Sequence, residues 1–287
     1  SEVPYRLNAL DSDIAALRHK YATNYDNTLF TDICIETISR CNSKCSFCPV
    51  SVQNEKRPLK RMSQQTWNFI IDQLKELSFS GNMFPYINNE IFLDKDIFKK
   101  LEYARSKLGF NVFIYIETNG LLLKEEKDRG LELVEKMFKY VDQILINDYA
   151  DTEESYINFN PRIRYLIKNL HKIKIERKVN LTVVHRQLNQ LLNNRFGKVE
   201  GSSAQSVPKK ELFCDFPFFQ INFNPVGDAF ICCRDSYYEE TIGNIHKNTI
   251  KEIWDNDRYK EIRNGFLNNE RVATVCKKCT SSGTLTI

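Results

Sequence analysis

Three cysteines within eight residues constrain this chain of 287 residues most strongly. Cys41, Cys45 and Cys48 have the spacing C-x3-C-x2-C and follow the apolar run from Phe30 to Ile35. Three thiolates on one short loop can hold a cubane cluster of four irons and leave one iron without a protein ligand. A structural zinc site needs four ligands, and no nearby histidine or fourth cysteine completes one. The spacing therefore predicts an iron–sulfur cluster with one open iron.

Segments with the pattern of strands and helices alternate through the first two thirds of the chain. Such alternation predicts an α/β fold with a parallel sheet covered by helices, either open or curled into a partial barrel. The working residues of these folds lie at the carboxyl ends of the strands. Strands are predicted over 30–35, 83–88, 110–116, 141–147 and 179–185, and helices over 7–22, 63–78, 95–108, 124–140 and 153–171. Polar groups at 41–48, 88–90, 118–120 and 147–148 all follow predicted strands.

The pattern changes after residue 195. Residues 196–210 are rich in Gly, Ser and Lys, which predicts a linker. Residues 218–233 favour a hairpin that turns at Pro225–Asp228, and 248–265 favour a helix. We therefore expect an N-terminal helical extension over 1–29, an α/β core over 30–205 and a small C-terminal domain of β-hairpin and helix over 206–287.

Four cysteines of the C-terminal part form a second set. Cys214 and Cys232 have the pattern C-x12-G-x4-C, and Cys276 and Cys279 form a C-x2-C knuckle. Four thiolates suit either zinc or an iron–sulfur cluster, so this set alone leaves both open. Beside the first cysteine loop, iron–sulfur is favoured. A cubane with four protein ligands cannot chelate a substrate, but it can pass an electron.

The first cysteine loop, with Phe47 before its third cysteine, resembles the radical S-adenosylmethionine (SAM) superfamily. In that family the amino and carboxylate groups of SAM chelate the open iron of a [4Fe-4S] cluster. An electron from the cluster cleaves SAM, and the 5′-deoxyadenosyl radical abstracts a hydrogen atom from the substrate. The resemblance implies a partial (β/α)6 TIM-like barrel, SAM as cofactor and a flavodoxin- or ferredoxin-type reductant.

The resemblance also implies cofactor-binding positions. Asn88-Asn89-Glu90-Ile91 corresponds to a Gly-Gly-Glu-Pro-like turn whose glutamate holds the SAM amino group. The glutamate is kept here, whereas the glycines and the proline are not. Thr118-Asn119-Gly120 matches the turn after the third strand, near the SAM ribose or carboxylate, and Asn147 ends the fourth strand, where polar residues contact the cofactor.

The C-terminal cysteines resemble the auxiliary-cluster domains called SPASM and twitch, as do Gly243-Asn244 and Ile253-Trp254. A full SPASM domain holds two clusters and needs more cysteines than are present here. The resemblance therefore implies one auxiliary cluster and two [4Fe-4S] clusters in total. Its spacing favours Cys232 over Cys233 as a ligand, which leaves Cys233 and Cys34 without an assigned cluster.

Within the superfamily, Asn194-Arg195-Phe196-Gly197 and the Gly227 hairpin resemble the 2-deoxy-scyllo-inosamine dehydrogenases and related aminoglycoside enzymes. This resemblance implies a small polar substrate, such as a sugar or an aminocyclitol, with Arg195 beside it. Dehydrogenation then follows if the auxiliary cluster accepts an electron from the substrate radical. Three alternatives stay open: epimerisation with Cys233 or Cys34 as hydrogen donor, modification of a ribosomal peptide, and a structural zinc protein.

Composition disfavours several other classes of protein. The net charge is +4, from 41 basic and 37 acidic residues without clustering, which argues against a dedicated nucleic-acid binder. No apolar stretch reaches the ~20 residues of a membrane helix, and residues 1–13 lack the pattern of a signal peptide. An odd number of cysteines, nine, suits a reducing compartment. We expect a cytoplasmic enzyme that acts on neither membranes nor nucleic acids.

Overall fold

Eight strands form one sheet. The computed structural model describes residues 16, 18–23, 29–45, 48–52, 57–124, 126–149, 160–186 and 213–279. The order of strands across the sheet is β5-β4-β3-β2-β1-β6-β7-β8. The strands are β1 (Asp32–Ile35), β2 (Asn82–Phe84), β3 (Phe113–Thr118), β4 (Gln143–Tyr149), β5 (Asn180–Arg186), β6 (Gln220–Phe223), β7 (Asp228–Phe230) and β8 (Thr241–Asn244).

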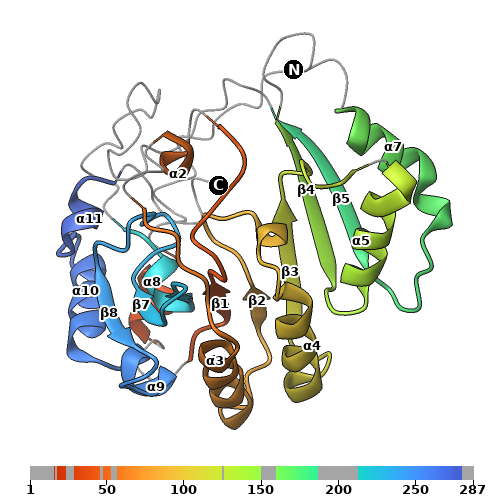
Figure 1. Ribbon diagram of the computed structural model, residues 1–287. Helices are drawn as coiled ribbons and strands as arrows, with labels where there is room; N and C mark the ends of the chain where they lie inside the picture. The colour runs from red at the N-terminus through yellow and green to blue at the C-terminus, as the bar shows by residue number, and fades with distance from the viewer. Residues whose placement is uncertain are drawn as a thin grey trace.

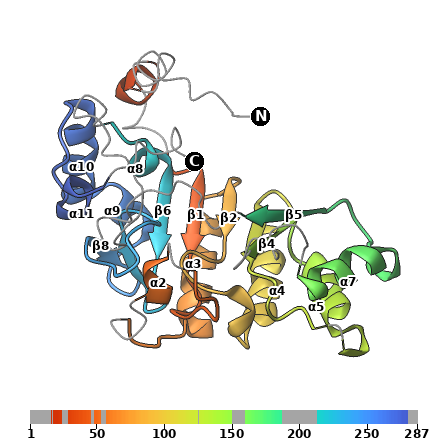
Figure 2. The same cartoon turned by 90° about the horizontal axis from the view of Figure 1, so that it is seen from above.

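Helices follow the strands in the alternation that the sequence predicts. Figure 2 shows α3, α4, α5 and α7 along one side of the parallel strands. The α-helices are α2 (Pro49–Val52), α3 (Gln64–Glu76), α4 (Ile97–Leu108), α5 (Arg129–Phe138), α7 (Pro161–Asn169), α8 (Phe216–Phe219), α9 (Ile250–Trp254), α10 (Asp257–Leu267) and α11 (Thr274–Lys277). Short 3-10 turns are η3 (Ile91–Leu93), η4 (Glu126–Asp128) and η5 (Leu170–Lys172).

Six neighbouring strands of the sheet run parallel. The strands β1 to β5 pair in sequence order, and β6 pairs with the free side of β1, where Asp32 lies beside Gln220 and Ile35 beside Phe223. The sheet is open (Figure 1), which confirms the α/β class and the partial barrel. Because β6 pairs with β1, the C-terminal hairpin continues the sheet of the core.

Residues on the parallel strands alternate between two faces, as the pleat of a strand requires. On β3, Ile114 and Ile116 are fully buried in the hydrophobic core, whereas Glu117 points to the other face and lines a cavity. On β4, Ile146 belongs to the core and Asn147 lines that cavity. The concave face of the sheet is therefore the polar face.

The C-terminal hairpin turns where the sequence predicts. Asn222 and Phe223 of β6 pair antiparallel with Phe230 and Ala229 of β7. Gly227 in the turn has φ +84°, and a Cβ at this position would lie 2.6 Å from Cγ2 of Ile245. The turn therefore needs glycine both for its backbone conformation and for the close approach of β8.

Two predicted elements differ from the structure. The second strand was expected over 83–88 but ends at Phe84, because Pro85 has no N–H to donate to the sheet. The helix expected over 248–265 is two helices, α9 and α10. Asn256 separates them, since its side chain accepts from the amide of Tyr259 at 2.8 Å and caps α10.

The described residues of the expected helix over 7–22 are helical. Tyr21 stacks on Phe218 of α8, with ring centroids 4.8 Å apart, so this segment packs against the C-terminal part of the chain. Among all described helices, none is both long enough and apolar enough to span a bilayer. The linker expected over 196–210 lies outside the described residues.

Candidate active site at the carboxyl ends of the strands

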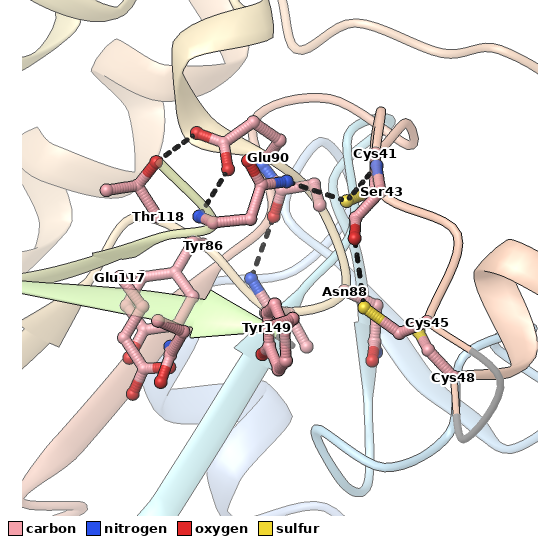
Figure 3. Close-up of a pocket in the computed structure, with 14 residues that line it drawn as sticks. Cys41, Ser43, Cys45, Cys48, Tyr86, Asn88, Glu90, Glu117, Thr118 and Tyr149 are labelled. Carbon is pink, nitrogen blue, oxygen red and sulfur yellow. Dashed lines mark hydrogen bonds between the residues drawn. The ribbon is translucent and has the colours of Figure 1, made fainter. Parts of the chain in front are cut away.

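A cavity of about 160 Å³ lies at the carboxyl ends of β1 to β4. Its walls come from four loops that are far apart in the sequence (Figure 3). The structure brings together there every described residue of the predicted SAM and first-cluster sites, namely Cys41, Cys45, Cys48, Asn88, Asn89, Glu90, Thr118 and Asn147. Phe47 lies outside the described residues.

The three cysteines of the first loop are partly buried and face this cavity. The hydroxyl of Ser43 lies 2.9 Å from the sulfur of Cys45, and the side-chain amide of Asn119 lies 3.5 Å from the sulfur of Cys41. Burial raises the pKa of the Cys41 thiol to about 11. Iron would reverse this effect, because a bound metal holds the thiolate.

Within the described residues, no three His, Cys, Asp or Glu side chains are grouped closely enough to bind a single metal ion. The thiols instead border a cavity, into which a larger cluster would have to fit. Polar groups beside the sulfurs, such as the Asn119 amide, are of the kind that hydrogen-bond to cluster sulfurs. The residues present therefore fit an iron–sulfur cluster.

Glu90 is buried, with 1% of its surface exposed, so it is not a surface acid. Its carboxylate accepts from the hydroxyl of Thr118 at 2.8 Å and from the backbone amide of Asn119 at 2.9 Å. Burial raises the pKa of Glu90, while these hydrogen bonds oppose the shift. The described residues provide only neutral donors to this carboxylate, which leaves it suited to a cationic ligand.

The far side of the cavity carries polar and aromatic residues that the sequence did not single out. Figure 3 places Glu117 and Tyr86 away from Cys45 and Cys48. The Glu117 carboxylate accepts from Nδ2 of Asn147 at 3.0 Å and from the hydroxyl of Tyr115 at 2.9 Å. The position of Glu117 directly before the Thr118 turn was the signal for it, because strand ends supply the working residues.

A buried charge network lies beneath the second turn. Arg57 and Glu36 are 1% and 0% exposed, and they form an ion pair that the hydroxyl of Tyr238 also joins. Nη1 of Arg57 donates to the carbonyl of Asn88 at 2.9 Å, and Glu36 accepts from the amide of Asn88 at 3.1 Å. The turn that carries Glu90 is thus held from below by charged groups. Sequence patterns give no sign of this network, since its members lie far apart in the chain.

The four auxiliary cysteines line a second, smaller cavity. Burial raises the pKa of the Cys214 thiol to about 12. Cys232 lines this cavity, and Cys233 is not among its lining residues. Nη1 of Arg271 donates to the carbonyls of Cys276 at 3.2 Å and Cys279 at 2.9 Å, so it fixes the knuckle. Four thiolates around one cavity fit a cluster that the protein saturates.

Of the two predicted catalytic residues, the structure describes Cys233 and not Arg195. Arg195 lies outside the described residues. Cys233 is partly buried, and the side-chain amide of Asn88 donates to its carbonyl at 2.8 Å. Cys34 on β1 is buried, and its pKa is raised by this burial and by the neighbouring Cys233 thiol. The two cysteines without an assigned cluster therefore lie close together.

Comparison with known proteins agrees with this arrangement. The model of the radical SAM superfamily matches residues 35–190, and the model of the SPASM iron–sulfur cluster-binding domain matches residues 214–280. The first match covers more than half of the chain, so the protein belongs to the radical SAM superfamily. It is a radical SAM enzyme that uses a [4Fe-4S] cluster and SAM, with an auxiliary cluster in the SPASM region.

The chain is 26% identical over 256 residues to the S-adenosyl-L-methionine-dependent 2-deoxy-scyllo-inosamine dehydrogenase of Niallia circulans, which covers 88% of this chain and 93% of that relative. Among solved structures, BtrN in complex with AdoMet and 2-DOIA matches with a TM-score of 0.66 and 22% identity, over 88% of this chain and 94% of BtrN. Tagged anSMEcpe with bound AdoMet matches with a TM-score of 0.57 and 13% identity, over 86% of this chain and 82% of that one. These solved structures share the fold.

Proposed function

We propose that this radical SAM enzyme is a dehydrogenase that oxidises a hydroxyl-bearing carbon of a small polar substrate, of the sugar or aminocyclitol class. One observation carries the proposal: a second cavity lined by four cysteines is joined to the SAM cavity by the contact from Asn88 to Cys233. The resemblance to the dehydrogenase of Niallia circulans supports the substrate class.

In the first cavity, Cys41, Cys45 and Cys48 hold the cluster that binds SAM. When bound, the two cofactors supply the 5′-deoxyadenosyl radical that abstracts a hydrogen atom. Glu90 holds the amino group of SAM, since its buried carboxylate receives only neutral donors from the described residues. Thr118 and Asn119 fix the orientation of that carboxylate. Phe47, Asn88, Asn89 and Asn147 complete the SAM site.

In the second cavity, Cys214, Cys232, Cys276 and Cys279 hold one [4Fe-4S] cluster. Four protein ligands leave no iron open to substrate, so the role that remains is electron transfer. After hydrogen-atom abstraction, loss of a proton from the substrate radical would leave one electron to remove, and these four cysteines would hold the cluster that accepts it. The result is a carbonyl group on the substrate, a net oxidation by two electrons.

The polar wall of the first cavity suits a hydroxylated ring. The Glu117 carboxylate and the hydroxyl groups of Tyr86 and Tyr149 can bond to substrate hydroxyl or amino groups, and the two aromatic rings offer apolar surface to the ring face. Arg195 is the further substrate contact that we propose from the family resemblance. A flavodoxin or ferredoxin supplies the electron that starts the reaction, and we place the enzyme in the cytoplasm.

The domain boundaries belong to the same proposal. Residues 1–29 form an extension, 30–205 the SAM core and 206–287 the auxiliary domain. The pairing of β6 with β1 makes the last two parts share one sheet.

The test is turnover by protein whose clusters have been reconstituted without oxygen. With SAM, a reductant and 2-deoxy-scyllo-inosamine, we expect 5′-deoxyadenosine and the corresponding ketone in equal amounts. Deuterium at the oxidised carbon should appear in 5′-deoxyadenosine. The Cys41→Ala variant is the control, because it lacks a ligand of the first cluster. If 5′-deoxyadenosine forms but neither aminocyclitols nor aminosugars are oxidised, the proposal is wrong.

One observation favours a second function, epimerisation. Cys233 is not among the residues that line the auxiliary cavity, and its carbonyl accepts from Asn88 of the SAM cavity, so Cys233 is the candidate hydrogen donor. Turnover in deuterated water separates the two functions. An epimerase would put deuterium into its product and lose this on Cys233→Ala, whereas a dehydrogenase would release a ketone with either protein.

A further inference from the structure

Two buried arginines line the cavity of the auxiliary cysteines. Arg234 lies two residues after Cys232 and is 7% exposed, and Arg271 lies before the knuckle and is 8% exposed. Removing a guanidinium from water costs several kcal/mol unless anions or acceptors replace the water. Two cations buried at one cavity therefore indicate that the cavity receives negative charge.

The two arginines are engaged to different extents. Arg271 holds the backbone of the knuckle through the carbonyls of Cys276 and Cys279. The guanidinium of Arg234 lies 4.9 Å from the ring centroid of Phe216, which also lines the cavity. Among the described residues, Nη1 of Arg234 has no hydrogen-bond partner. A buried donor without an acceptor points to a ligand that accepts from it.

The carboxylates of Asp235 and Glu240 are engaged by other groups. Asp235 accepts from the backbone amide of Glu240 at 3.0 Å, and Glu240 forms an ion pair with Arg258 at 2.6 Å. Asp215 lies beside Cys214 and adds a negative charge at the cavity. Nη1 of Arg234 is therefore a donor that remains for the group that the four cysteines hold.

The negative charge of an iron–sulfur cluster with four thiolate ligands explains why two arginines are buried at this cavity. Four thiolates around an oxidised cubane core leave roughly two negative charges, and one further electron adds a third. Nearby positive charge and hydrogen bonds to cluster sulfurs stabilise the reduced form more than the oxidised form, which raises the reduction potential. A guanidinium stays protonated throughout, so the electron enters without a proton.

We propose that Arg234 donates through Nη1 to a sulfur of the auxiliary cluster and, together with Arg271, raises the reduction potential of that cluster so that it accepts an electron. This inference rests on the auxiliary cluster of the proposed function. Arg234 is a positioning and charge-supplying residue for the cluster, and it is not expected to contact the substrate.

The test is the potential of the auxiliary cluster, titrated anaerobically in the reconstituted full chain and followed by electron paramagnetic resonance. Arg234→Gln should shift the potential to more negative values. Arg234→Lys, which keeps the charge but loses the planar guanidinium, should shift it less. Lys251→Gln is the control, because Lys251 is 65% exposed on α9 and should leave the potential unchanged.

The outcomes separate this inference from the proposed function. An unchanged potential in Arg234→Gln, with full iron content, would overturn the inference alone. Loss of the auxiliary cluster from both Arg234 variants would also overturn it, because the side chain would then be needed for assembly of the site. A wild-type protein with only one cluster would end the acceptor role and this inference together. The titration needs no substrate, so an error in the substrate class does not affect it.

Discussion

The side-chain amide of Asn88 donates to the backbone carbonyl of Cys233 at 2.8 Å. Asn88 belongs to the turn that carries Glu90, and Cys233 follows an auxiliary cysteine. One hydrogen bond therefore ties the SAM cavity to the segment that lines the second cavity. Arg57 and Glu36 hold the backbone of Asn88 at the same point. Polar contacts thus connect the turn that carries Glu90 to the segment after Cys232.

We expect Asn88→Ala to uncouple the two halves of the reaction. The change leaves the partly buried carbonyl of Cys233 without its donor, at a cost of about 1 kcal/mol. The ratio of oxidised product to 5′-deoxyadenosine should fall several-fold, while SAM is still cleaved. Both products are measured in the same reaction. Asn264→Ala, an exposed change on α10, is the control, and an unchanged ratio in Asn88→Ala would remove the coupling role.

Glu90→Gln should weaken the binding of SAM. A hydrogen bond to a charged group contributes about 1.5–3 kcal/mol, so the Kd for SAM should rise by about 10- to 100-fold. Equilibrium binding of SAM to the reconstituted protein measures this change. Glu261→Gln, at an exposed glutamate of α10, should bind SAM as the wild type does. Equal affinities in the two variants would show that Glu90 does not hold the amino group.

Although Glu90→Gln should weaken the binding of SAM, it should increase the stability of the folded protein without SAM. Burial raises the pKa of Glu90, so the folded protein binds a proton there more tightly than the unfolded chain does. This contribution to stability is present at low pH and is lost as pH rises above the ordinary glutamate value toward the raised pKa. Without SAM at neutral pH, Glu90→Gln should therefore have a higher Tm than the wild type. A lower Tm would mean that the lost hydrogen bonds outweigh the removed charge.

Much of the site follows from the sequence, because its chemistry is local. The spacing of Cys41, Cys45 and Cys48 predicts a cluster with an open iron, and the strand-end rule predicts Glu90, Thr118 and Asn147 at one edge of the sheet. In the structure, all six of these residues line one cavity. These side chains lie near one another because parallel strands bring their carboxyl ends together whatever their separation in the chain.

The rest depends on contacts between distant segments. Nothing in the sequence near Arg57 indicates that it pairs with Glu36 and contacts Tyr238, which lies 181 residues further along. The position of β6 beside β1 is equally non-local. The prediction of one helix in place of α9 and α10 was a local error. Asn256 is a good helix cap, but the apolar pattern continues across it.

Changes at the buried ion pair should rank by the charge that they leave unpaired. Arg57→Leu leaves the Glu36 carboxylate buried without a cation, which costs about 3–5 kcal/mol. Tyr238→Phe removes one hydroxyl and keeps the pair, so we expect a loss of about 1–2 kcal/mol. Denaturant unfolding of both variants measures the two values. A Tyr238→Phe variant as unstable as Arg57→Leu would show that the hydroxyl, rather than the charge pair, holds the junction.

The two cysteine sets should fail in different ways when one ligand is removed. Two cubanes require about eight irons per chain, so Cys41→Ala and Cys276→Ala should each lose up to about four. Cys41→Ala should abolish SAM cleavage, because an intact open cluster is needed to bind and reduce SAM. Cys276→Ala should keep part of the cleavage but lose oxidation of the substrate, because the electron then has no acceptor. Iron content, 5′-deoxyadenosine and ketone, measured on the same anaerobic samples, decide the matter. Undiminished oxidation by Cys276→Ala would mean that the electron leaves the substrate by another route.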